Sequence, residues 1–178
     1  IALKQISLGK VKFTNSNNAA IVTEYDVDYL IHAEQKIGVS VSYSTGTGAK
    51  PLTVDIPKAL KLGKELYGAT YKFLFMNVDT FEKFASQEEV YKKCASFVQN
   101  VVGSQDAPDL ATVNAYLAKK KELYRGLQII VIDQDITLEL ADGSRKTENP
   151  FEDDVMLFSE SKVLGNTYWK KPIDAKAM

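Results

Sequence analysis

The stretch GLQIIVIDQDITLELADG, from Gly126 to Gly143, changes its hydrophobic pattern part-way along. Residues Leu127–Ile132 are almost entirely apolar and rich in β-branched side chains, which predicts a central strand of a sheet. After Asp133 apolar and polar residues alternate, and Asp142-Gly143 is a turn sequence typical of hairpins. The chain must therefore supply a sheet core and also a hairpin that leaves it.

Asp133 and Asp135 stand two positions apart, so in a strand their carboxylates would lie on one face. Such a pair has two interpretations: an acidic catalytic or metal site, or the point at which the strand leaves the core. The second is favoured, because a catalytic site would also need a base, a nucleophile or a metal cluster nearby. The only histidine, His32, is far away in the sequence. The acidic cluster Glu152–Asp154 lacks the spacing of a calcium loop and predicts a solvated turn.

Composition narrows the classes further. With 178 residues, of which 45% are hydrophobic, the chain is long enough for one well-formed core. A net charge of −1 gives no electrostatic reason to expect strong binding of nucleic acid. No apolar run approaches the roughly 20 residues of a membrane helix, so no membrane partner is expected. Cys94 is the only cysteine and lies in an apolar stripe, which predicts a buried side chain and no intrachain disulfide.

Residues 1–32 form a pattern of their own. Apolar residues alternate from Ile6 to Phe13, where Gly9 interrupts the phase as a predicted bulge, and Asn15–Asn18 is turn chemistry. The second arm puts five apolar residues on one face, opposite three acidic ones: Ile21, Tyr25, Val27, Tyr29 and Ile31 against Glu24, Asp26 and Asp28. This predicts a long projecting hairpin. Two strands alone are marginal in water, so its apolar face must lie on its own domain or on a neighbouring subunit.

Residues 33–54 are interpreted as a flexible connection. Its loop Ser44–Pro51 fits neither a phosphate-binding nor a dinucleotide-binding pattern, so no nucleotide or other cofactor is expected. Asp55 is predicted to cap a helix that stops at Gly68. Gly63 inside this helix predicts a close approach by another element.

The remainder, residues 55–178, predicts an α+β core with mixed or antiparallel sheets and packed helices. Strand Tyr71–Met76 leads to Asn77 as a helix cap, and Ser86 with Glu89 predicts a capping box for the next helix. One further helix is expected up to Gly126, with Leu110, Val113, Leu117 and Tyr124 facing inward. A last strand is expected at Val155–Phe158.

The order of seven stretches resembles the major capsid proteins of tailed bacteriophages, the lambda-type capsid protein family with the Hong Kong 97 fold. They are LGK (Leu8–Lys10), YDVDY (Tyr25–Tyr29), DIPKAL (Asp55–Leu60), FMNVDTFEKF (Phe75–Phe84), GLQIIVID (Gly126–Asp133), PFEDDVMLF (Pro150–Phe158) and LGNTYW (Leu164–Trp169). The chain departs from the family in lacking a Trp before the Asp55 helix and a Pro after Gly68. Such proteins are also longer, so the resemblance implies a truncated subunit.

The resemblance implies a structural, non-enzymatic role. Residues 1–32 would be the extended loop that lies over an adjacent subunit, and 55–178 would supply the spine helix and parts of the peripheral and axial domains. The implied inter-subunit contacts are Phe13, Asn15, Asn17, Asn18, Ile21, Tyr25 and Tyr29. Copies of the full-length protein would assemble in the bacterial host cytoplasm into the icosahedral shell of the virion, and the shell would enclose packaged DNA without specific binding. Scaffold and decoration proteins would be further partners.

Two alternatives stay open at this point. One is a cytosolic α+β enzyme or ligand-binding domain that uses an acidic site around Asp133 and Asp135. The other is an encapsulin-like shell protein, which has the same fold as the capsid but serves as a cellular compartment.

Overall fold

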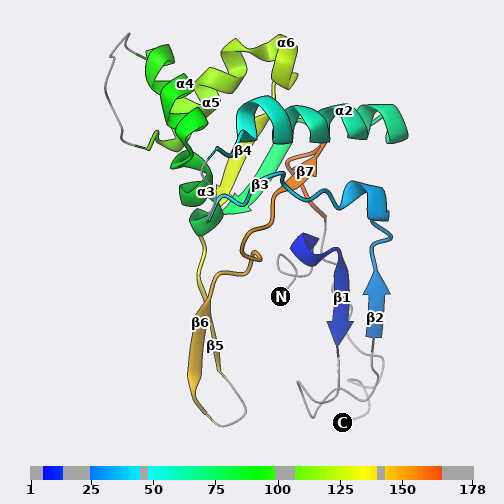
Figure 1. The fold of residues 1–178 in the computed structure, drawn as a ribbon. Helices are drawn as coiled ribbons and strands as arrows, with labels where there is room; N and C mark the ends of the chain where they lie inside the picture. The colour runs from blue at the N-terminus through cyan, green and yellow to red at the C-terminus, as the bar shows by residue number, and fades with distance from the viewer. Residues whose placement is uncertain (1–5, 14–24, 45–47, 99–106, 140–142, 166–178) are drawn as a thin grey trace, which may run out of the picture.

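The computed structural model describes residues 6–13, 25–44, 48–98, 107–139 and 143–165 (Figure 1). It confirms an α+β protein with mixed and antiparallel sheets and packed helices. A body of helices on a three-stranded sheet carries two separate two-stranded ribbons. In Figure 1 both ribbons leave the body on the same side.

The body sheet has the order β4-β3-β7. Its centre is β3 (Phe73–Asn77), which pairs in parallel with β4 (Gln128–Ile132) and antiparallel with β7 (Leu157–Ser159). The prediction that Leu127–Ile132 forms a central strand is therefore wrong, because within the described residues β4 lies at an edge. The most buried strand is β3, where Leu74 to Asn77 are all buried.

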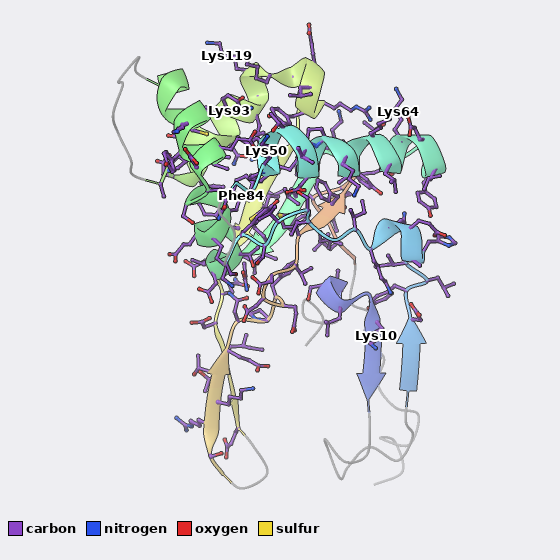
Figure 2. All side chains as sticks on the ribbon, viewed as in Figure 1. Lys10, Lys50, Lys64, Phe84, Lys93 and Lys119 are labelled. Atoms are coloured by element: carbon purple, nitrogen blue, oxygen red, sulfur yellow. The ribbon has the colours of Figure 1, made fainter. Side chains whose placement is uncertain are left out.

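Helices connect β3 to β4 and cover the sheet. They are α3 (Val78–Ala85), α4 (Glu88–Val98), α5 (Leu110–Lys119) and α6 (Lys121–Tyr124), while α2 (Ile56–Tyr67) precedes β3 and packs against α6. The predicted single helix from Leu110 to Tyr124 is in fact two, because the backbone breaks at Lys120 (φ −94°, ψ 43°). In Figure 2, Phe84 lies in the interior beside α3, whereas Lys64 and Lys119 point outward from α2 and α5.

Three local predictions in the body are confirmed. The Asn77 side chain accepts a hydrogen bond from Thr80 N at 2.8 Å, which caps α3. Gly68 ends α2 in the left-handed conformation, with φ 65°. A Cβ on Gly63 would lie 2.2 Å from the ring of Tyr71, so the missing side chain does allow the predicted close approach.

The start of α2 differs from the prediction. Asp55 stands at the N-cap position as predicted, but its side chain makes no capping hydrogen bond, because a π-helical turn, Pro51–Asp55, comes first and Asp55 already has helical dihedrals. Its carboxylate instead accepts hydrogen bonds from Ser40 N (3.3 Å) and from the hydroxyl of Tyr43 (2.8 Å). The predicted connection 33–54 thus reaches the body through these contacts, and Ala49 and Leu52 are buried there.

Glu89 caps this π-helical turn from another element. Its carboxylate accepts from Leu52 N (2.9 Å) and Thr53 N (3.2 Å), and also from the Thr53 hydroxyl. The predicted capping box with Ser86 is wrong, since the Ser86 hydroxyl donates to Lys83 O instead. Free N–H groups at a helix start attract a carboxylate wherever the fold brings one, so the true partner lies 37 residues away in sequence.

A tyrosine completes the same turn. Pro57 has no N–H, so it cannot bond the carbonyl of Leu52, which stands five residues earlier in the π-helical spacing. The hydroxyl of the fully buried Tyr124 donates to that carbonyl at 3.0 Å. Burial also raises the pKa of Tyr124, which keeps this hydroxyl protonated as a donor. Tyr124 and Glu89 together anchor the start of α2.

The N-terminal ribbon consists of β1 (Lys10–Phe13) and β2 (Tyr25–Asp28), antiparallel. The prediction of a strand across Ile6–Leu8 is wrong, because these residues form a helical turn in which Gly9 N donates to Ile6 O at 3.1 Å. Gly9 has φ 73° and joins the turn to β1. The second ribbon consists of β5 (Ile136–Glu139) and β6 (Arg145–Glu148), as the predicted hairpin after Asp135 requires.

Candidate assembly surfaces

The N-terminal ribbon stands apart from the body sheet (Figure 1). Its register pairs Val11 with Val27 and Phe13 with Tyr25, alternating with Lys10 opposite Asp28 and Lys12 opposite Asp26. Because side chains alternate along a strand, the sequence in this register predicts apolar pairs on one face and opposite charges on the other. Among the described residues no third strand pairs with this ribbon.

The seven contact residues expected from the sequence fall into two groups. Asn15, Asn17, Asn18 and Ile21 lie outside the described residues. Phe13 and Tyr25 form the register pair farthest from the body, and Tyr29 follows β2 with 48% of its surface exposed. The structure thus puts three of the seven on the same ribbon, at its outer end and at its base.

Apolar side chains at the base of the ribbon are strongly exposed. Leu30 is 79% exposed and has φ 56°, and its N–H donates to the Asp28 carboxylate at 2.9 Å. Leu8, Tyr29 and Val163 are also exposed hydrophobic residues of this region. The sequence analysis did not single out Leu30, because this residue follows Tyr29 directly and so breaks the alternation of apolar and polar residues. That break in phase was the only available signal.

Two hollows separate the ribbon base from the body sheet. One, of about 960 Å³, is lined mainly by apolar side chains, among them Tyr29, Ile31, Phe75, Val131 and Leu157. The other, of about 580 Å³, lies beneath residues 35–39 and shares Ile31 and Leu157 with the first. Ile31 lines both hollows and packs against Gly9, where an added Cβ would lie 2.8 Å from the Ile31 side chain. Within the described part of the chain, Tyr29 and Leu30 beside these hollows stay exposed.

The acidic residues form a separate hollow. Asp133 and Asp135 are exposed and line a cavity of about 500 Å³ together with Asp79, Glu148 and Asp153. Asn77, also in its lining, donates from its amide to the Asp153 carboxylate while it caps α3. The contact between Asn77 and Asp153 in the wall of this cavity is therefore explained by the capping of α3. Within the described part of the chain, no group of three or more His, Cys, Asp and Glu side chains could hold a metal ion.

The other candidate reactive residues have structural roles. Cys94 is fully buried, and burial raises the pKa of its thiol to about 11, so the thiol stays protonated near neutral pH. The prediction of a buried cysteine is confirmed. The ring of His32 stacks on Tyr67, with 5.5 Å between ring centroids. None of the described helices is long and apolar enough to span a membrane.

Comparison with known proteins adds no family. No protein-family model matches the chain, and no curated protein matches it. The function must therefore be argued from the surfaces themselves: a two-stranded ribbon whose sequence is amphipathic, exposed apolar side chains at its base, and a second ribbon leaving the body on the same side (Figure 1).

Proposed function

We propose that the chain is a subunit of a self-assembling protein shell, of the kind formed by tailed-phage major capsid proteins. One observation carries the proposal: the N-terminal ribbon has only two strands in the described residues and exposes Tyr29 and Leu30 at its base. A two-stranded ribbon is marginal in water unless its apolar face is covered. A neighbouring copy of the same chain would provide that cover.

The second ribbon supports the same conclusion. In its register Leu138 stands opposite Lys146, and Glu139 opposite Arg145, away from the body sheet. An isolated hairpin that contributes little to its own core is useful when it contacts another molecule. Two such ribbons on one subunit allow contacts with two neighbours. Heterologous contacts of this kind close into rings and shells.

In this proposal the ribbon is the contact arm and the body is the wall of the shell. Tyr29, Phe13 and Tyr25 would meet the adjacent subunit, together with the tip residues Asn15, Asn17, Asn18 and Ile21. The shell would stand in a virion and enclose DNA without specific contacts. An encapsulin-like compartment would use the same surfaces, and what the purified shells contain, DNA or protein cargo, distinguishes the two.

The test is assembly of the full-length wild-type protein against charge variants at exposed leucines. Leu30→Asp puts a charge into the proposed contact, while Leu66→Asp puts one on α2, where Leu66 is 55% exposed. Sedimentation and negative-stain electron microscopy are expected to show capsomers or shells for wild type and Leu66→Asp, and only dispersed subunits for Leu30→Asp. Deleting the tip Asn15–Asn18 is expected to have the same effect as Leu30→Asp. Normal shells from both ribbon variants would contradict the arm assignment.

The rival proposal is an enzyme or ligand-binding domain built on the acidic cavity, which the 500 Å³ hollow around Asp133 and Asp135 favours. It requires a ligand that stabilises the folded chain. A thermal-shift panel of divalent cations and cationic metabolites tests it, with Asp133→Asn/Asp135→Asn as the matched variant. A shift seen in wild type and lost in the double variant would support this rival. Shell formation unaffected by the double variant would support the capsid-like proposal.

A further inference from the structure

The body sheet has one long edge that could pair with a strand of another molecule. In β4, Gln128 N donates to Lys72 O at 2.8 Å, so this residue faces β3. The peptide groups of a strand alternate in direction, so those of Ile129 and Val131 face away from β3, along the edge. Among the described residues no strand pairs with this side of β4, and an open strand edge attracts strands of other copies.

Asn114, on α5, occupies this edge. Its side-chain oxygen accepts from Ile129 N at 2.7 Å, and its side-chain nitrogen donates to Ile129 O at 3.0 Å. The N–H and the C=O of one outward-facing residue are thus both bonded to one side-chain amide, which takes the place of a residue on a neighbouring strand. Asn149 bonds a different part of β4: its amide donates to Ile132 O at 3.1 Å, on the side of the strand that faces β3.

The position of Asn114 supports a role beyond helix formation. It lies in the middle of α5, where Asn is a poorer helix former than Ala or Leu. Its amide is directed at the sheet, and α5 packs against β4. The opposite edge strand, β7, is three residues long and offers little length for pairing.

We propose that Asn114 is a latch that closes the β4 edge against strand pairing with a second copy of this chain. Without it, copies would join body sheet to body sheet in open arrays. With it, association is left to the two ribbons. The proposed role of Asn114 rests on the geometry of β4 and α5 alone. Its test is therefore independent of the shell proposal.

The test compares Asn114→Ala with two matched variants. Asn114→Lys also removes the amide but puts a charge at the edge, which opposes strand pairing. Asn77→Ala removes another capping amide, on α3, and controls for general destabilisation. All are made in the Leu30→Asp background, so that ribbon contacts do not contribute. Residue-level amide exchange at Ile129 and Val131 and sedimentation are followed against protein concentration.

In dilute solution, exchange of the Ile129 amide is expected to be about tenfold faster in Asn114→Ala and Asn114→Lys, because its hydrogen bond is lost. As concentration rises, only Asn114→Ala is expected to associate and to regain protection at Ile129 and Val131. The latch is overturned if Asn114→Ala remains monomeric, or if Asn114→Lys or Asn77→Ala associates equally. If Asn114→Ala does not fold, Asn114→Ser is measured in the same way and judged by the same outcomes.

Discussion

The body and the two ribbons are built from similar residues but are stabilised in different ways. In the body Leu74 is fully buried at the centre of a three-stranded sheet, whereas Leu30 at the ribbon base is 79% exposed. The body also joins distant segments through buried polar contacts, such as the bond from Tyr124 to Leu52. Among the described residues, the two strands of each ribbon pair only with each other. A folded subunit with unsupported ribbons is what a molecule that completes its packing in an assembly would look like.

The largest expected difference comes from the same substitution in each region. Leu74→Ala creates a cavity in the body and is expected to lower the free energy of unfolding by about 2–5 kcal/mol. Leu30→Ala removes an exposed side chain and is expected to change it by less than about 0.5 kcal/mol. Chemical denaturation under conditions that prevent assembly measures both values. A large loss of unfolding free energy in Leu30→Ala would show that the ribbon base is part of the body core. The body and the ribbon would then not differ in how they are stabilised.

The next effect concerns Glu89, which fixes the start of α2. Burial opposes its charge, but hydrogen bonds from Thr53, Lys93 and the N–H of Leu52 outweigh burial and lower its pKa in the folded chain. Glu89→Ala leaves two N–H groups without their acceptor and is expected to cost about 1–3 kcal/mol. Denaturation at neutral pH measures this loss.

The lowered pKa also gives a pH dependence. A group with a lower pKa in the folded state contributes stability above its unfolded pKa, about 4.3 for Glu, and loses it as the pH falls through the folded value. The gap in unfolding free energy between wild type and Glu89→Gln is therefore expected to narrow below about pH 4.3. Glu88 pairs with Lys92 on the exposed surface, where solvent screens the pair, so Glu88→Gln is expected to show a much smaller gap of the same sign. A gap that is constant from pH 7 to pH 3 would contradict the role of the Glu89 carboxylate.

Sequence reasoning succeeded where the signal and its target are neighbours. Asn77 caps the helix that begins at the next residue, and Gly68 ends the helix just before it. It failed where the partner is remote. Glu89 stands three residues after Ser86, as in a capping box, yet it caps a turn 37 residues earlier.

The position of β4 in the sheet was also predicted wrongly, because its neighbours are remote in sequence. The composition of Leu127–Ile132 describes burial on both faces, but it does not say which strand lies beside it. The edge position of β4 and the bonds of Asn114 to Ile129 depend on how α5 packs. An Asn in the middle of a predicted helix was the one local signal, since Asn is disfavoured there. The acidic pair was located correctly at the exit of the strand, because Asp133 and Asp135 are both exposed.

The smallest effect tests how the N-terminal ribbon is joined to the body. Gly9 (φ 73°) and Gly68 (φ 65°) both hold left-handed backbone, so an alanine at either is strained by about 1 kcal/mol. At Gly68 the strain lies in the body and should appear in the global unfolding midpoint. At Gly9 the new methyl group also meets Ile31, and the damage should stay within the ribbon: faster exchange of the Tyr29 amide, which donates to Gly9 O at 3.0 Å, with an unchanged midpoint. If Gly9→Ala lowers the midpoint as much as Gly68→Ala does, the ribbon unfolds together with the body, and the two regions are one cooperative unit.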